Sequence, residues 1–480
     1  MNMLKEKRGV GWSIFLAVLF LVSFAVLKPG AAHAGEGTLN GYVQHRSELG
    51  LETPRRYAVS EFLGNLEMNY KFDEQWALHT ILRGRYDGVY DLRNDFKNNV
   101  SPSDREDMRS EGEVREIYLD YKPRPDLSFR LGRQVVIWGE SDGLRLMDMI
   151  NPFDLRWGYL SRDFEDIRTP LVMLRVNYQL PGLERYMAGL ELVWIPGDFA
   201  VTEIPAAGTA WAPESPVFFN SQVQALVGMG LFPSVTDVKK PQTLKNSRYG
   251  VKFTGNVART DFSLNYLHTY ADSAVYHFAG VSAPPAFPPG FVGTFNLEAK
   301  YPWKHIVGVT FNHDFGLVVA RGEVAYEFNN EFQNLTTPDW TEKSDYVKAM
   351  LGFDWILGIP GFNKGRTFLI SGQVFDFHIV DHNNNIVNIP YGYTVKEDEQ
   401  VLTLLVNTGF LSDTILPEIF VAYDASYYSW WIKPKLGLQF GTHVRVEAGA
   451  NIFEGKNTQR LPFGAFDEDD TAYLQVRYQL

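Results

Sequence analysis

Apolar and polar residues alternate along most of the chain after residue 40, in runs of about ten positions that end at turn residues. In LVMLRVNYQL (171–180), every even-numbered position is apolar or aromatic, and the odd-numbered positions from 175 onward are polar; HVRVEAGANIF (443–453) alternates in the same way. Successive side chains of a strand point to opposite faces, so each run predicts a strand with one apolar and one polar face. A tilted strand of about ten residues also spans the hydrocarbon core of a bilayer.

The alternation predicts an all-β fold, a transmembrane antiparallel β-barrel of about 18 strands (range 16–18). The first strands are expected at Gly41–Leu49, Glu61–Tyr70, Trp76–Tyr90, Val114–Tyr121, Leu127–Trp138 and Leu171–Leu180. The next are expected at Ala188–Ile195, Tyr249–Val257, Phe262–Tyr270, His305–Phe311, Val318–Phe328 and Tyr346–Trp355. The last are expected at Thr367–Phe377, Val401–Phe410, Pro417–Asp424, Trp430–Phe440, Val444–Phe453 and Thr471–Leu480.

The links between these strands sort by length. If the first strand runs outward, nearly every long link falls on one side of the barrel and the short links fall on the other, except DASYY (424–428), a short link on the outer side. Short turns on the periplasmic side and long extracellular loops are typical of outer-membrane barrels. The long links are Asp91–Glu113, Gly139–Thr169, Phe199–Ser247, Ala271–Lys304, Asn329–Asp345, Val380–Gln400 and Glu454–Asp470.

The N-terminus has the layout of a secretory signal peptide. Lys5, Lys7 and Arg8 precede an apolar run (10–27), and Ala32 and Ala34 supply the A-x-A pattern of a cleavage site. We therefore predict a signal peptide over residues 1–34, an outer-membrane β-barrel over residues 35–480, and location in the cell outer membrane. An uncleaved N-terminal membrane anchor is the alternative, since the apolar run is almost long enough to span a bilayer.

Composition narrows the chemistry further. The chain has no cysteine, which excludes thiol catalysis, cysteine-ligated zinc and iron–sulfur clusters. Aromatic residues make up 14% of the chain although its mean hydropathy is only −0.19, a combination that fits interfacial aromatic girdles around a polar lumen. The net charge of −12 argues against nucleic acid as a partner. We expect no cofactor, no metal and no catalytic residue.

Charged residues fall on the polar faces, and an Arg or Lys facing lipid at mid-depth would cost about 2–4 kcal/mol, so these faces line the lumen. Lys433, Lys435 and Arg445 belong to this set. The link Gly139–Thr169 is also dense in charge: it is either a solvated outer loop held by its own salt bridges or a segment folded into the lumen as a constriction. Candidate lumen and constriction residues are Arg83, Arg85, Arg130, Arg133, Asp142, Arg145, Asp148, Asp154, Arg156, Arg175, Arg321 and Glu323. Within the link, LRLMDMI (144–150) predicts a short helical turn that Asn151–Pro152 ends.

One segment resembles a known family. GRQVVIWGESDGLRLMDMINPFDLRW (132–157) resembles a family of Gram-negative outer-membrane proteins described as a domain of unknown function. It is similar, more distantly, to alginate-export-type porins, which carry a comparable Gly-Arg-Gln…Trp-Gly strand end. The resemblance implies a monomeric barrel of the porin or exporter type and carries no catalytic residue across. The matching positions are Gly132, Arg133, Gln134, Trp138, Gly139, Asn151, Pro152 and Asp154.

The leading functional prediction is a channel or transport pore for small or partly hydrophobic solutes, without chemistry. One alternative is a barrel that sheathes an exported partner such as a cytochrome conduit. The other is a lipid-modifying enzyme, because GESDG (139–143) matches the nucleophile motif around Ser141, although the strand-to-helix context of that motif is missing. Expected partners are outer-membrane lipid, lipopolysaccharide and a small-molecule solute. The apolar loops 217–232 and 279–292 either pack on themselves or bind a protein partner.

Overall fold

A computed structural model describes residues 35–480 except 159, 161, 163, 207, 210, 213–220, 283–292, 360, 364, 389–392 and 456–461. The predicted signal peptide, residues 1–34, lies outside the described residues and stays a prediction. Among the described residues, no helix is both long and apolar enough to cross a membrane.

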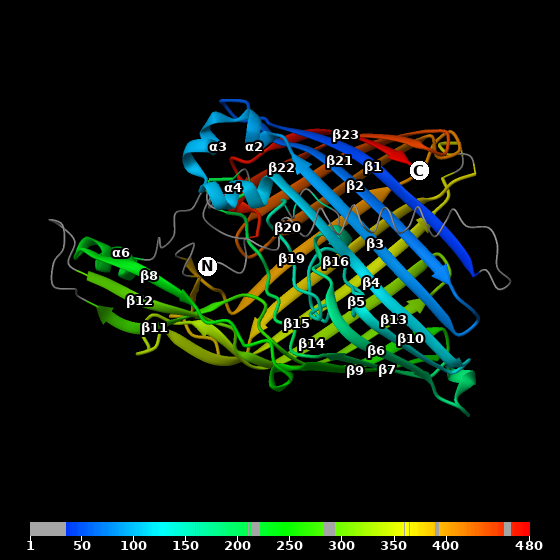
Figure 1. Ribbon diagram of the computed structural model, residues 1–480, viewed down its shortest axis with the longest axis horizontal. Helices are drawn as coiled ribbons and strands as arrows, with labels where there is room; N and C mark the ends of the chain where they lie inside the picture. Colours follow the sequence, from blue (N-terminus) through cyan, green and yellow to red (C-terminus); the bar gives the residue numbers. More distant parts are fainter. Residues whose placement is uncertain are drawn as a thin grey trace.

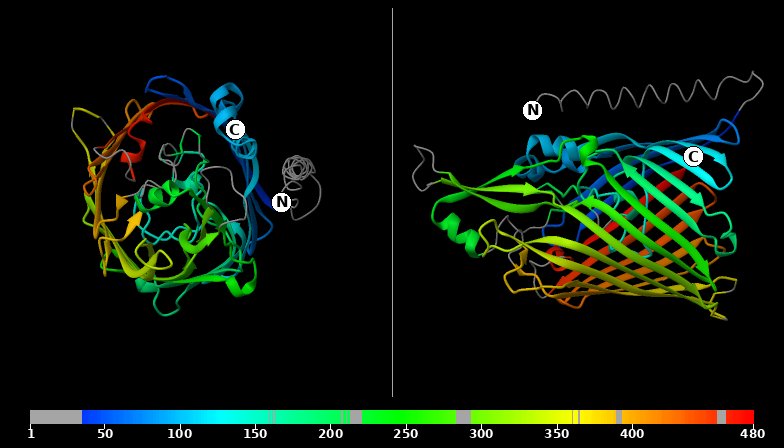
Figure 2. Two further views of the ribbon diagram at one scale, coloured as in Figure 1. Left: turned by 90° about the vertical axis from the view of Figure 1, so that its left-hand side faces the viewer. Right: turned by 90° about the horizontal axis from the view of Figure 1, so that it is seen from below.

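Eighteen antiparallel strands form one closed barrel, as predicted. Figures 1 and 2 show the strands running at an angle around this barrel. The first nine strands are β1 (Glu36–Gly50), β2 (Tyr57–Lys71), β3 (Trp76–Asp87), β4 (Ser110–Arg124), β5 (Leu127–Gln134), β6 (Leu171–Gln179), β7 (Gly189–Ile195), β9 (Arg248–Val257) and β10 (Thr260–Tyr270). The other nine are β13 (Trp303–Asp314), β14 (Val318–Gln333), β15 (Thr341–Leu357), β16 (Phe368–Ile379), β19 (Asp398–Asn407), β20 (Ile415–Asp424), β21 (Ser429–Phe440), β22 (Val444–Gly455) and β23 (Thr471–Gln479).

The barrel closes where the last strand meets the first. β1 pairs with β23 from Tyr42↔Gln479 to Gly50↔Thr471, so the wall has no free strand edge. Closure satisfies the backbone N–H and C=O groups that lipid cannot hydrogen-bond. The alternation follows the prediction: on β23, Leu474 and Val476 are 52% and 41% exposed on the outside, whereas Tyr473 and Gln475 are buried inside.

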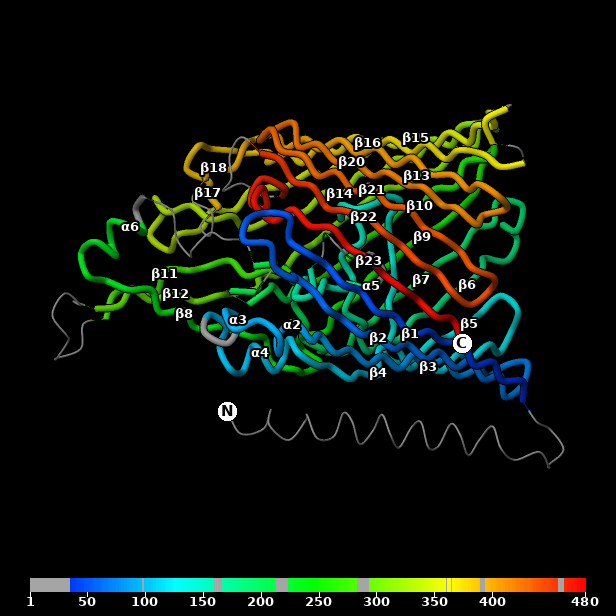
Figure 3. The backbone as a smooth tube through the Cα atoms, turned by 90° about the horizontal axis from the view of Figure 1, so that it is seen from above, coloured from blue at the N-terminus to red at the C-terminus, as the bar shows by residue number. Residues whose placement is uncertain are grey.

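The long links gather at one end of the barrel, as predicted, and carry structure that the alternation did not predict (Figures 1 and 3). A second sheet of three strands projects there, with β12 (Gly293–Lys300) antiparallel to β11 (Val275–Ser282) and parallel to β8 (Leu231–Asp237). The remaining elements are α2 (Val89–Leu92), α3 (Asn94–Asn99), α4 (Pro102–Arg109), α5 (Phe164–Ile167), α6 (Ser221–Gly228), β17 (Val387–Asn388), β18 (Tyr393–Thr394), η1 (Glu184–Tyr186), η2 (Leu244–Asn246) and η3 (Gly464–Phe466).

The described part of the first apolar loop packs against β12, which follows the second apolar loop, and against the loop between β14 and β15. Val223 of α6, Phe295 and Leu297 of β12, and Trp340 form one buried cluster, and the rings of Phe278 and Trp340 stack with centroids 4.8 Å apart. Residues 217–220 and 283–292 of these loops lie outside the described residues. A protein partner at these loops stays a prediction.

The main apolar core lies inside the barrel. Ile306, Met350, Phe375 and Trp431 point inward from the wall and pack against Leu146, Met147 and Ile150 of the link between β5 and β6. This link, residues 135–170, is called the lumen segment below; Figure 2 shows the interior of the ring occupied by chain. Of the two alternatives for this link, the structure therefore shows the inward fold, and the lumen is partly filled.

A buried ion cluster joins three neighbouring strands on the inner wall. Glu327 of β14 is fully buried between Lys304 of β13, 2.8 Å from its carboxylate, and Lys348 of β15. Replacing Glu327 by alanine leaves two buried ammonium groups without their counter-ion, and we expect it to destabilise the barrel by about 3–5 kcal/mol. The denaturant midpoint of reversible unfolding in detergent measures this loss.

The half-exposed pair Asp120–Arg130 provides the control for that measurement, with carboxylate and guanidinium 2.7 Å apart. Asp120→Ala is expected to cost no more than about 1 kcal/mol, because solvent screens exposed pairs. Equal midpoints for Glu327→Ala and Asp120→Ala would contradict the prediction.

Candidate functional site: the divided lumen

The lumen segment leaves the wall after Gln134 and rejoins it at Leu171, and these two residues are register partners on β5 and β6. The strand predicted over Leu127–Trp138 therefore ends four residues early. Asn151, which is fully buried, explains the departure: its side-chain oxygen accepts the Val136 amide proton at 2.8 Å, and its amide group donates to Thr169 at 2.9 Å. The middle of the segment is thus hydrogen-bonded to both of its ends.

The segment is attached to the far wall through Glu323 of β14. The carboxylate accepts backbone N–H groups from Glu140 at 2.7 Å, Ser141 at 3.2 Å and Met147 at 2.5 Å. Gly139 permits this approach: its φ is +128°, and a Cβ atom there would lie 2.9 Å from the Glu323 carboxylate. Glu323 is 1% exposed, so this anchor is shielded from water.

A second attachment to the far wall surrounds Asp142. Its carboxylate accepts from Arg321 of β14 and from Gln373 of β16, each at 2.7 Å. Arg321 also donates to the Glu140 carbonyl at 2.8 Å and pairs with Asp354 of β15 at 2.9 Å. Three neighbouring strands of the far wall therefore hold one turn of the segment.

The helical turn predicted for residues 144–150 is wrong, because this stretch forms bends. The Met147 amide is bonded to Glu323, and the Arg145 guanidinium donates to the carbonyls of Asp148 at 2.6 Å and Asn151 at 2.8 Å. The backbone groups that a helix would pair internally are used by these side chains instead. Leu146, Met147 and Ile150 are then free to enter the apolar core.

Arg145 also ties the segment to the long-loop end of the barrel, through Asp272 just beyond β10. The guanidinium lies 2.6 Å from the Asp272 carboxylate, which also accepts from Thr202 at 3.1 Å. Burial alone would raise the pKa of Asp272, but the charges of Arg145 and Lys304 outweigh it and hold that pKa below its ordinary value. Asp272 is thus kept ionised as the counter-ion of Arg145.

On the near side, the segment and the wall of β3–β5 enclose a cavity of about 170 Å³ that is rich in arginine. Arg83 pairs with Asp166 at 2.7 Å, and Arg162 and Arg85 both pair with the buried Glu61, at 2.6 and 3.1 Å. The lining arginines are Arg83, Arg85, Arg115, Arg133, Arg156, Arg162 and Arg168. The lining acids are Glu111, Glu113, Asp154, Asp166 and Glu203.

On the other side, two cavities lie along the wall of β16, β19, β20 and β21. One of about 330 Å³ lies beside the segment, one of about 480 Å³ lies toward the short-turn end, and Glu418 lines both; the two together are called the passage below. Leu405, Phe420 and Trp431 supply apolar surface in the first cavity. The basic lining residues are Arg162, Arg366, Lys433, Lys435 and Arg445, and the acidic ones are Asp142, Asp413 and Glu418.

The structure brings most of the twelve candidate residues together. Asp142, Arg145, Asp148, Asp154 and Arg156 belong to the segment, with Asp148 paired to Arg168 at 2.6 Å and Arg156 to Glu111 at 3.2 Å. Arg83, Arg321 and Glu323 hold the segment from the walls, the Arg85 guanidinium lies over the Trp157 ring, and Arg133 lines the arginine cavity.

Two candidates stand further from the segment. Arg175 pairs with Glu191 at 2.7 Å, and Glu191 also accepts from the Trp138 indole at 2.9 Å, so Arg175 is joined to the segment indirectly. Arg130 pairs with Asp120 on the wall alone. Sequence reasoning missed Glu61 and the apolar lumen residues Phe420 and Trp431. The signal for Phe420 is ILPEIFVAYD (415–424), where Leu416, Phe420 and Ala422 share a face with Glu418 and Asp424.

Ser141 sits in a turn held by its own neighbours. Its hydroxyl donates to the Leu144 carbonyl at 2.8 Å and its amide to Glu323. This geometry engages the hydroxyl in local structure, unlike the exposed hydroxyl of a nucleophile elbow.

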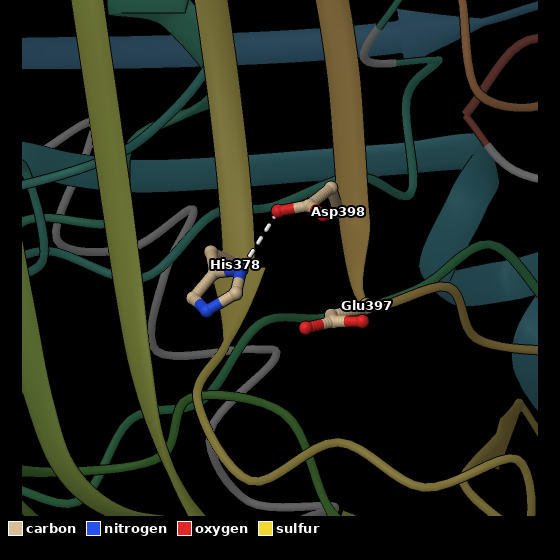
Figure 4. A group of neighbouring side chains, drawn as sticks. All are labelled: His378, Glu397 and Asp398. Atoms are coloured by element: carbon tan, nitrogen blue, oxygen red, sulfur yellow. Dashed lines mark hydrogen bonds and ion pairs between the residues drawn. The ribbon is translucent and has the colours of Figure 1, made fainter.

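Three potential metal ligands meet at the long-loop end, away from the lumen segment. His378 ends β16, and Glu397 and Asp398 stand at the start of β19; their ligand atoms lie within 4.8 Å of one another (Figure 4). The His378 Nδ1 atom lies 2.7 Å from the Asp398 carboxylate. Glu397 and Asp398 are exposed, so the group is an ordinary surface pair with a neighbouring acid. The expectation that the chain needs no metal stays a prediction.

Comparisons with known proteins give a family. Among solved structures, OpdK from Pseudomonas aeruginosa has a TM-score of 0.48 at 10% identity over 93% of this chain and 98% of its own. OccAB3 of Acinetobacter baumannii has 0.46 at 8% over 93% and 99%, and OmpF of Salmonella typhi has 0.43 at 8% over 94% and 99%. No curated protein matches the sequence. The family described as protein of unknown function (DUF1302) matches residues 53–480, and the chain therefore belongs to that family.

Proposed function

We propose that the protein is a selective pore of the bacterial outer membrane through which small solutes pass without chemical change. One observation carries the proposal: the lumen segment is bonded to both walls, and a passage remains beside it along β16–β21. A segment inside a wide barrel narrows it to a constriction, and the residues that line a constriction sort solutes by size and charge. Eighteen strands are enough to enclose such a route.

The lining charge favours anions. Five basic and three acidic side chains line the passage, an excess of two positive charges, in a chain whose net charge is −12. Arg162 and Arg445 are each paired, at 2.6 Å, with an acid outside this lining, Glu61 and Glu447, so Lys433 and Lys435 carry the proposed preference. Basic residues at a constriction raise the local concentration of anions and repel cations.

The alternatives fit the filled lumen less well. A sheath around a cytochrome needs an empty lumen, whereas the segment and its apolar core occupy this one. A lipid-modifying enzyme needs a free nucleophile, whereas the Ser141 hydroxyl is engaged locally. Export through a signal peptide, passage of partly hydrophobic solutes and the relation to alginate-export-type porins are further parts of the proposal.

Single-channel recording of the purified, refolded chain in a planar bilayer tests the pore. We expect steady single-channel steps and, under a KCl gradient, a reversal potential whose sign reports anion preference. The heat-dependent shift in electrophoretic mobility verifies that the barrel is folded. A folded barrel without conductance would contradict the pore, and cation preference would contradict the role assigned to the lining charge.

A further inference from the structure

We infer that the passage recognises amphipathic organic anions, with an aromatic or aliphatic body and one carboxylate, at a site between Trp431 and Lys433. The inference rests on the proposed pore and names its substrate class. It depends on the order in which apolar and charged side chains follow one another along the inner wall.

The order is set by the register of β20 and β21. From the long-loop end downward, Ala422 pairs with Trp431, Phe420 with Lys433, and Glu418 with Lys435. The inner wall therefore changes from an apolar pair to an aromatic–lysine pair and then to a glutamate–lysine pair within five residues of each strand. Lys435 and Glu418 are 2.8 Å apart, so this ion pair lies below Lys433 at the lower end of the site.

The apolar part is a preformed aromatic wall. The Trp431 ring meets Phe420 edge-on, with centroids 5.1 Å apart, and lies parallel to Phe453 at 6.2 Å. The Trp431 indole N–H donates to Asn451 at 3.4 Å, which orients the ring. Asn451 is fully buried and is held in turn by Glu48 at 3.2 Å. Trp431 is itself only 4% exposed, so a ligand contacts the small part of the side chain that lines the cavity, and that part is already ordered.

The cationic part lies directly below this wall. The Lys433 ammonium is 5.6 Å from the Trp431 ring centre, and both side chains line the cavity of about 330 Å³. Pockets of this volume accept small organic molecules. Ser371, Gln373 and Thr403 add polar lining from β16 and β19 of the same wall, and Asp142, Gly143 and Arg162 of the lumen segment line the other side. A carboxylate at Lys433 thus places the apolar body of the same molecule against Trp431 and Phe420.

Wholly hydrophilic ions are expected to bind this site more weakly, because they gain nothing from burial against Trp431 and Phe420. Apolar cations fit poorly because Lys433 repels them. An amphipathic anion is the class that satisfies both halves, entering with its body toward the long-loop end and its carboxylate toward the short turns.

Isothermal titration of the full folded barrel in detergent tests the site, with a blank titration of each ligand into detergent. The probes are 3-phenylpropionate, propionate as the same charge without the body, and phenethylammonium as the body with the opposite charge. We expect saturable binding of 3-phenylpropionate and at least tenfold weaker binding of the other two. Trp431→Ala and Lys433→Gln are each expected to weaken 3-phenylpropionate binding at least tenfold.

Trp430→Ala is the matched control, because Trp430 is the neighbouring indole on the same strand and is 39% exposed on the outer surface. Its binding of 3-phenylpropionate should equal that of the unchanged protein. Equal binding by Trp431→Ala and Trp430→Ala, or equal binding of all three probes, would overturn the inference. Conductance without such binding leaves the pore standing and refutes the site. Binding without conductance leaves the site standing and refutes the pore.

Discussion

Removal of the lumen segment is expected to raise the single-channel conductance severalfold and to weaken its ion preference. Gln134 and Leu171 are register partners, so a four-residue turn can replace residues 135–170 and leave a continuous β5–β6 hairpin. The shortened barrel keeps all eighteen wall strands but loses the partition between them. Charges on a wide wall act over only about 8 Å at physiological salt, so ions in the centre of the widened lumen pass largely unsorted.

A point substitution gives a graded form of the same result. Glu323→Ala removes three hydrogen bonds to a carboxylate, each contributing about 1.5–3 kcal/mol, and should produce larger, fluctuating currents as the turn around Gly139 detaches. Glu323→Gln keeps an acceptor and should lie between. Glu298→Ala, on the projecting sheet, is the control and should leave the currents unchanged. A deletion variant that is folded but conducts like the unchanged protein would show that ions do not pass beside the segment.

Reversal of two lysines in the passage is expected to invert the ion preference. Lys433→Glu together with Lys435→Glu changes the lining from five basic and three acidic residues to three basic and five acidic. The excess of two positive charges becomes an excess of two negative charges. The reversal potential in a KCl gradient should therefore change sign, while the conductance stays of the same order because the width of the route is unaltered.

Lys239→Glu with Lys245→Glu is the control for this experiment. Both lysines are exposed on the outer loops, and the double substitution changes the net charge of the protein by the same amount. A change of sign in both double variants would assign selectivity to the net charge of the molecule. If the reversal potential changed sign in neither double variant, the current would follow another route.

The barrel was predictable because its determinants are local. Alternation with a period of two, a strand length matched to the bilayer and links sorted by length placed all eighteen strands within a few residues. The projecting sheet was missed because β8 and β12 pair in parallel across a long stretch of chain, and no periodicity reveals such a partner. The early end of β5 was missed because VVIW (135–138) has the composition of a strand, and a distant side chain, Asn151, redirects it.

The site was predictable in composition and less so in geometry. Inward charges such as Arg321 and Glu323 followed from the cost of facing lipid, and the charge density of the lumen segment suggested a constriction. The sequence did not indicate that these two residues bind the segment from the opposite wall, because the contacts join residues nearly two hundred positions apart. Trp431 and Phe420 escaped notice because an apolar residue in a barrel strand is expected to face lipid.

The cross-connection of the walls also has a mechanical consequence. An empty tube of eighteen hydrogen-bonded strands resists stretching along its strands, but it ovalises readily when lateral pressure in the surrounding membrane changes. The lumen segment acts as a strut: it is bonded to β14 and β16 on one side and to β2 and β3 on the other. The lumen segment therefore fixes the cross-section of the barrel. The width of the route beside it does not follow changes in the lateral pressure of the bilayer.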